Sequence, residues 1–132
     1  MGRKLLTHVR DVMRGGAEAP RTNIKASITD ALLEITSKRM GMTVVIDDSQ
    51  KVVGIFTDGD LRRLIEKGAD LRNFKARDVM HGHPRTIRLD ALAVEAAELM
   101  EQYRITSILV TDDAGHLCGA INTNDLMRAK VI

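Results

Sequence analysis

The stretch that decides the fold is Gly54-Ile55-Phe56-Thr57-Asp58-Gly59-Asp60-Leu61, and it recurs 65 positions later as Gly119-Ala120-Ile121-Asn122-Thr123-Asn124-Asp125-Leu126. Two more landmarks recur in the same order: Asp11-Val12-Met13 as Asp78-Val79-Met80, and Asp47-Asp48 as Asp112-Asp113. Matched landmarks at nearly constant spacing indicate an internal duplication. We predict two domains, with an N-terminal segment and the first repeat in residues 1–74 and the second repeat in residues 75–132.

Each repeat has one predicted amphipathic helix ahead of this stretch. Apolar residues at steps of three and four give the helix one apolar face. They are Ile28, Ala31, Leu32 and Ile35 in the first repeat, and Leu92, Ala96, Met100 and Tyr103 in the second. Ser27 and Asp90 stand near the helix starts, where capping residues are expected.

A hairpin is predicted in each repeat from two short apolar, β-branched runs. The first strands are residues 43–46 and 107–110, the second are 52–57 and 117–122, and aspartate-containing turns separate them. Shorter lead-in strands are expected near 22–24 and 86–89. Each hairpin runs into another helix, at 61–67 and from 123–124 onward, and Gly68 is placed to end the former in a left-handed conformation.

These elements predict an α/β (α+β) fold class with two β-α-β-β-α repeats. A three-stranded sheet covered by two helices buries too little apolar surface to be stable alone. We therefore expect the two repeats to pack sheet to sheet about a pseudo-twofold axis and to form two related clefts.

The composition of the 132 residues narrows the functional class. Hydrophobic residues make up 44% of the chain but aromatic residues only 2%, so an aliphatic core with methionines is expected. The net charge of +2 comes without a clustered basic face or stacking aromatics, which argues against nucleic-acid binding. The single cysteine, Cys118, forms no disulfide within the chain, and no apolar run approaches a bilayer span. We predict a cytoplasmic protein with no membrane partner.

Residues 57–60 are the strongest candidates for a ligand-binding site. A strand ending in a hydroxyl enters a helix N-terminus, where free backbone N–H groups and the helix dipole favour an anion such as phosphate. The Asp60 carboxylate suits the two hydroxyls of a ribose. A second interpretation stays open, in which Thr57 and Asp58 cap the helix and Asp60 favours its dipole. The copy at 122–125 keeps the acid but lacks the glycine, so we expect the first site to be better formed.

The repeated marks resemble a pair of cystathionine-β-synthase (CBS) domains, also called a Bateman module, and the resemblance covers essentially the whole chain. It implies that Thr57 and Asp60 bind the phosphate and ribose of adenosine nucleotides, and Asn122 and Asp125 stand at the matching positions of the second repeat. The predicted contacts are Thr57, Asp58, Gly59, Asp60, Asn122, Asn124 and Asp125, with a weaker base-holding group at Thr22, Thr86, Met42, Thr43, Ser107 and Ile108.

A more specific resemblance is to the C-terminal part of bacterial D-arabinose 5-phosphate isomerases. It is carried by Gly2-Arg3-Lys4-Leu5-Leu6, Asp30-Ala31-Leu32-Leu33-Glu34, Gly41-Met42-Thr43-Val44 and residues 54–63. It implies an N-terminal sugar-isomerase domain in a longer parent chain, in lipopolysaccharide and 3-deoxy-D-manno-octulosonate biosynthesis. No obligatory cofactor is expected. The implied effectors are AMP, ADP, ATP or CMP-3-deoxy-D-manno-octulosonate, and the family implies a homodimer or a higher homo-oligomer.

Two other functional classes remain as alternatives. An oligomerisation module without a bound ligand fits the replacement of Thr57 by Asn122 in the second copy. A stand-alone enzyme is not expected, because no nucleophile stands with an oriented base, and no catalytic residue is predicted.

The remaining polar and sulfur-containing residues receive structural interpretations. His81-Gly82-His83 is interpreted as a surface linker, and no metal site is predicted. Cys118 is interpreted as an inert core thiol. The methionines are interpreted as core filler: Met40, Met42, Met80, Met100 and Met127.

Overall fold

The computed structural model describes residues 6–132, so most of the Gly2-to-Leu6 segment quoted above lies outside the described residues. The chain forms two compact units. The first-repeat unit is Pro20–Pro84, and the second-repeat unit combines residues 6–19 with Arg85–Ile132. The units do not coincide with the sequence repeats. Asp11-Val12-Met13 precedes the first repeat but folds with the second-repeat unit, and Asp78-Val79-Met80 precedes the second repeat but folds with the first-repeat unit.

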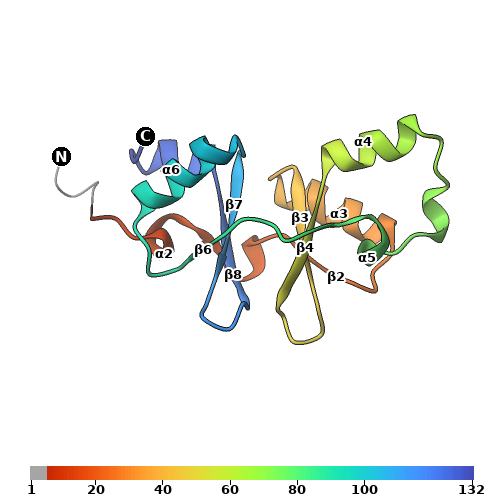
Figure 1. Cartoon of the computed structure of the whole chain (residues 1–132), viewed down its shortest axis with the longest axis horizontal. Helices are drawn as coiled ribbons and strands as arrows, with labels where there is room; N and C mark the ends of the chain where they lie inside the picture. The colour runs from red at the N-terminus through yellow and green to blue at the C-terminus, as the bar shows by residue number, and fades with distance from the viewer. Residues whose placement is uncertain (1–5) are drawn as a thin grey trace. The chain divides into compact units, whose positions relative to one another are not determined.

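The first-repeat unit is built on a four-stranded sheet with the strand order β2-β3-β4-β5 (Figure 1). Strand β2 runs parallel to β3, whereas the β3–β4 and β4–β5 pairs are antiparallel. The predicted hairpin and helices are confirmed, but the expectation of three strands was wrong, because β5 comes from the segment interpreted as a linker. The elements are β2 (Arg21–Asn23), α3 (Ile28–Lys38), β3 (Met42–Ile46), β4 (Val52–Thr57), α4 (Asp58–Glu66), a 3-10 turn (Leu71–Asn73), α5 (Ala76–Val79) and β5 (His81–Gly82).

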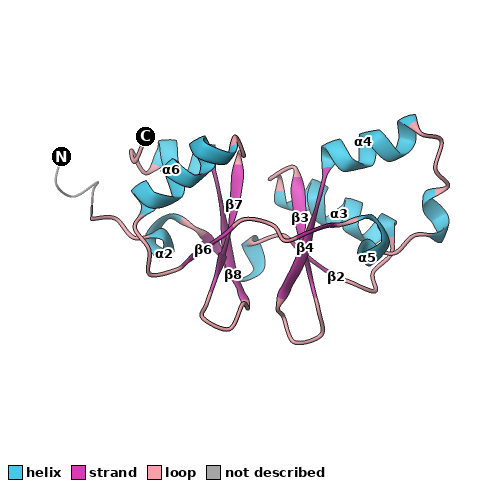
Figure 2. Cartoon of the chain, viewed as in Figure 1, coloured by secondary structure: helices cyan, strands magenta, loops and turns pink. Residues whose placement is uncertain are grey.

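The second-repeat unit repeats this plan with the strand order β1-β8-β7-β6 (Figure 2). Its fourth strand, β1, precedes the first repeat in sequence and pairs antiparallel with β8. A mixed α+β fold with two four-stranded sheets results. The elements are α2 (Val9–Val12), β1 (Arg14–Gly15), a 3-10 turn (Gly16–Glu18), β6 (Thr86–Arg88), α6 (Ala93–Tyr103), β7 (Ser107–Thr111), β8 (Leu117–Asn122) and α7 (Thr123–Arg128).

Local hydrogen bonds explain where the helices begin and end. Ser27 caps α3 as predicted, since its Oγ accepts from the backbone N–H of Asp30 at 3.1 Å. Gly68 follows α4 with φ +73°, which confirms the predicted left-handed residue. The expectation for Asp90 was wrong: Leu92 is the N-cap residue of α6, and Asp90 instead pairs with Arg88 at 3.5 Å.

Each unit has its own largely aliphatic core. In the first-repeat unit, the core cluster is Ala31, Ile35, Val45, Phe56 and Ala76; in the second-repeat unit it is Val9, Ile87, Ala93, Ala96, Met100, Ile108, Val110, Ile121 and Leu126. The predictions of a buried position were wrong for two residues, Tyr103 and Met127. Tyr103 is 38% exposed at the end of α6 with the Arg85 guanidinium 3.7 Å from its ring centre, and Met127 is 56% exposed on α7.

Two equivalent glycines let the short strands approach β4 and β8. A Cβ on Gly54 would lie 2.7 Å from the backbone oxygen of His81, and one on Gly119 would lie 2.6 Å from that of Arg14. Any larger residue would push the edge strand away. The repeated glycine is therefore a packing requirement of both sheets.

Candidate functional site

The N-terminus of α4 is closed by a reciprocal pair of hydrogen bonds. Thr57, at the end of β4, is the N-cap residue. Its Oγ1 accepts from the backbone N–H of Asp60 at 3.1 Å, and its own backbone N–H donates to Asp60 Oδ2 at 2.9 Å. This is a capping box. Asp58 is the first helical residue and exposed, so it does not act as the cap that the sequence suggested.

The Asp60 carboxylate is buried and held by donors from two further residues. Its side chain is 5% exposed, and Oδ1 lies 2.6 Å from an Arg63 guanidinium nitrogen and 2.5 Å from His81 Nε2. Burial raises the pKa of Asp60, but hydrogen bonds from the Thr57 backbone, His81 and Arg63 outweigh it and bring the pKa below its ordinary value. An ionised carboxylate only accepts, so Nε2 of His81 carries the proton in this contact.

Asp125 occupies the equivalent position at the start of α7. Asn122 replaces Thr57: its Oδ1 accepts from the Asp125 backbone N–H at 2.8 Å, and its backbone N–H donates to Asp125 Oδ2 at 2.9 Å. Arg128 reaches Oδ1 at 2.5 Å, as Arg63 does at Asp60. The third donor is Arg14, whose Nε lies 3.1 Å from Oδ1 and 3.2 Å from Oδ2.

The weaker candidates divide into buried and exposed residues. The hydroxyls of Thr22 and Thr43 hydrogen-bond to each other at 2.7 Å in the interior of the first-repeat unit, with Met42 buried on the same strand as Thr43. Of their counterparts, Thr86 is exposed, Ser107 half-buried and Ile108 buried. Gly59 is half-buried in the first turn of α4, and Asn124 is exposed in that of α7.

Sequence reasoning missed the donors on the two acids. His81 and Arg14 each directly follow an Asp-Val-Met segment and lie in β5 and β1, beside the strands that lead to Asp60 and Asp125. Aligning the two Asp-Val-Met segments would have placed a basic residue at this position in both repeats. The linker interpretation of His81 was wrong for this reason.

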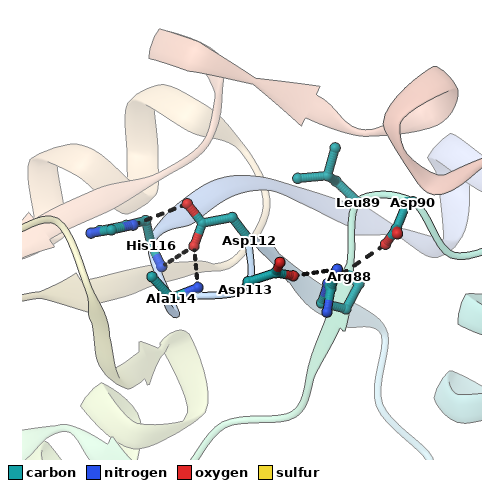
Figure 3. A pocket seen from close by; sticks show the side chains of 7 residues that line it. All are labelled: Arg88, Leu89, Asp90, Asp112, Asp113, Ala114 and His116. Atoms are coloured by element: carbon teal, nitrogen blue, oxygen red, sulfur yellow. Dashed lines mark hydrogen bonds and ion pairs between the residues drawn. The ribbon is translucent and has the colours of Figure 1, made fainter.

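A surface pocket of about 440 Å³ lies at the β7–β8 turn of the second-repeat unit (Figure 3). Arg88 pairs there with Asp113 and Asp90, and His116 Nδ1 lies 3.0 Å from Asp112 Oδ2. Asp112 also accepts backbone N–H bonds from Ala114 and His116 at 2.9 Å, which makes it the turn residue that the sequence predicted. No sequence motif indicates this pocket, because its residues come from two separate segments, 88–90 and 112–116.

Further observations concern metals, membranes and the thiol. Within residues 6–132, no three His, Cys, Asp or Glu side chains gather as metal ligands would, and no helix is both long and apolar enough to span a bilayer. Cys118 is half-buried in β8, with its Sγ 3.7 Å from the backbone oxygen of His116.

Comparison with known families matches the CBS domain to residues 9–67 and again to residues 76–132. The chain belongs to the CBS domain family. Both predicted repeats are covered, so the tandem CBS resemblance inferred from the repeated motifs is confirmed.

The curated relatives of this CBS pair include arabinose 5-phosphate isomerases. The chain is 48% identical over all 132 residues to the arabinose 5-phosphate isomerase KdsD of Escherichia coli K12, and 45% identical to KdsD of Pseudomonas aeruginosa. In each case it spans 40% of the relative's length. The predicted resemblance to this isomerase family is confirmed over the whole chain.

Solved CBS-pair structures share the fold. A structure of CBSX2 in complex with AMP has a TM-score of 0.79 and 25% identity, and covers 95% of this chain and 96% of its own. The CBS domain pair of MJ0100, in complex with 5′-methylthioadenosine and S-adenosyl-L-methionine, has a TM-score of 0.82 over 95% of this chain and 96% of its own, at 21% identity. The second likeness concerns the fold alone.

Proposed function

We propose that this chain is the regulatory, ligand-binding CBS pair of a D-arabinose 5-phosphate isomerase. The observation that carries the proposal is the 48% identity to KdsD over the whole chain, combined with a CBS domain match over both repeats. A catalytic sugar-isomerase domain elsewhere in the parent chain interconverts D-arabinose 5-phosphate and D-ribulose 5-phosphate in the cytoplasm, for lipopolysaccharide biosynthesis. The pair reports the level of a small-molecule effector to that domain, in a homodimer or higher homo-oligomer.

The proposed effector is a nucleotide, AMP, ADP or ATP, or the nucleotide sugar CMP-3-deoxy-D-manno-octulosonate. AMP is bound by CBSX2, which is 25% identical to this chain. The N-terminus of α4 supports phosphate binding, since Thr57 places a hydroxyl beside the first backbone N–H groups of the helix. The Asp60 carboxylate is the proposed acceptor for ribose hydroxyls. Asn122, Asn124 and Asp125, and the base-holding candidates near Thr22 and Thr86, remain proposed contacts of lower rank.

Calorimetry and thermal unfolding with the four candidate effectors test this proposal. A ligand that binds only the folded state raises the melting temperature, and above Kd the stabilisation grows with the logarithm of the ligand concentration. We expect at least one effector to release or absorb heat and to raise Tm, and Asp60→Ala to abolish both effects. Asp30→Ala is the matched control, because Asp30 holds the same third position in α3 but is exposed. If none of the four effectors produces heat or a rise in Tm, the proposal is contradicted.

One observation favours the structural alternative. Asp60 and Asp125 are both buried, and both are occupied by donors of the protein itself. An oligomerisation module would need these acids only to hold strands and helices together. Sedimentation of Asp60→Ala separates the alternatives: changed self-association without a change in ligand binding favours the structural role.

A further inference from the structure

The residue that follows Asp-Val-Met occupies the same place in both units. Arg14 lies opposite Ala120 in the β1–β8 pair, and His81 lies opposite Ile55 in the β5–β4 pair. Ala120 and Ile55 are themselves equivalent in the repeat. Each basic side chain therefore reaches the acid at the start of the helix that follows the neighbouring strand.

The two acids differ in which donors reach their Oδ2 atom. Asp60 Oδ2 accepts from the Thr57 backbone, and the Thr57 side chain also hydrogen-bonds to the carboxylate, whereas His81 and Arg63 both donate to Oδ1. Asp125 Oδ2 accepts from the Asn122 backbone and shares the Arg14 Nε–H with Oδ1. A carboxylate oxygen accepts about two hydrogen bonds. The edge strand β5 thus supplies no donor to Asp60 Oδ2, whereas Arg14 of β1 already donates to Asp125 Oδ2.

Charge and exposure strengthen this difference. Asp125 is paired with two guanidinium groups, and the Arg14 side chain is only 22% exposed. Asp60 is paired with one guanidinium group and with an imidazole that is 63% exposed. An arginine is always charged and a buried guanidinium–carboxylate pair is hard to displace, whereas an exposed imidazole is a weaker competitor.

We propose that the residue directly after Asp-Val-Met decides whether the acid of its unit accepts a ligand hydroxyl. His81 leaves Asp60 open to the ribose of a nucleotide, and Arg14 closes Asp125. His81 is thus a positioning residue that acts through Asp60, an inference that rests on the proposed nucleotide-binding function and deepens it.

The ratio of affinities for AMP and 2′,3′-dideoxy-AMP, measured by calorimetry, tests this assignment. Wild-type protein should prefer AMP by about tenfold or more, the effect of a hydroxyl hydrogen bond to a charged group. His81→Arg copies Arg14, and it should bring the ratio close to unity. His81→Gln keeps a neutral N–H donor and should retain the preference. His81→Lys is a second cationic variant should His81→Arg fold poorly by thermal unfolding.

The outcomes separate this inference from the proposed function. A structural effect of His81 would weaken both nucleotides equally and leave their ratio unchanged, so an undiminished preference in His81→Arg and His81→Lys overturns the inference alone. Equal affinity of wild-type protein for the two nucleotides, or no AMP binding at all, also overturns it. The proposed function fails only if ADP, ATP and the CMP-linked sugar also show no binding.

Discussion

Asp60 and Asp125 stand at the same position of the two repeats, yet their surroundings differ in the N-cap residue and in the donor from the edge strand. Both acids close a capping box and both accept from an arginine one turn into the helix, Arg63 or Arg128. The third donor is a histidine in one unit and an arginine in the other. The shared contacts hold the start of the helix together, and the differing one decides whether a histidine or an arginine pairs with the carboxylate.

This comparison distinguishes a carboxylate with a structural role, Asp125, from one proposed to bind a ligand, Asp60. A buried carboxylate that faces two guanidinium groups is a fixed structural element, since each partner satisfies the other. A buried carboxylate with one guanidinium and one exposed imidazole keeps some capacity for another donor. A repeat protein can in this way keep its architecture in both halves and specialise one of them.

The largest expected effect tests the feature that the two units share. Gly54→Ala and Gly119→Ala should each lower the free energy of unfolding by about 3 kcal/mol, because the added methyl group overlaps a backbone oxygen that cannot move freely. Gly82→Ala is the control: a Cβ there meets no atom within 4 Å, and its effect should stay within about 0.5 kcal/mol. Urea unfolding measures all three. A mild effect at Gly54 or Gly119 would show that β5 or β1 can shift at little cost.

An intermediate effect tests where the units differ. Asp125→Asn should lower the free energy of unfolding by about 2 kcal/mol, because it leaves two guanidinium groups without a counter-charge. Asp60→Asn should cost about 1 kcal/mol, since the exposed imidazole can turn to water. Urea unfolding at neutral pH gives both values. The reverse order, with Asp60→Asn the more damaging, would contradict the contrast between the two clusters.

The smallest expected effect is the part of the acid-induced loss of stability that comes from Asp60. Because the folded pKa of Asp60 is lowered from its ordinary value of 3.8, its contribution to stability is complete above that pH. The contribution is lost as pH falls through the folded pKa. Asp60→Asn should therefore flatten the pH dependence of the unfolding free energy below about pH 4.

His81→Ala provides the companion measurement for this acid-induced loss of stability. It removes one of the hydrogen bonds that lower the pKa of Asp60, so the acid-induced loss of stability should be smaller and should end at a higher pH than in wild-type protein. An acid-induced loss identical in wild type and Asp60→Asn would show that other groups dominate unfolding in this range.

The elements with a clear local pattern were predictable from the sequence. Both second hairpin strands, Val52–Thr57 and Leu117–Asn122, were placed at their observed bounds, and Ser27 and Gly68 were recognised as helix ends. The pairing of Thr57 with Asp60 was also visible as a spacing of three residues, although that spacing fits a cap and a ligand site equally. Asp90 failed as a cap because capping chemistry is common in loops and is not diagnostic without the backbone conformation.

The strand–turn–helix order and the acid of each repeat were determined by the sequence alone, because they depend on neighbours a few residues apart. The duplication was visible because the same motifs recur in the same order. Only the tertiary structure decided that β1 and β5 complete the sheets, and that Arg14 and His81 are the partners of Asp125 and Asp60. A two-residue strand carries no periodicity, and Arg14 lies 111 positions from its carboxylate. Such a contact depends on sheet pairing between distant segments, which no local pattern encodes.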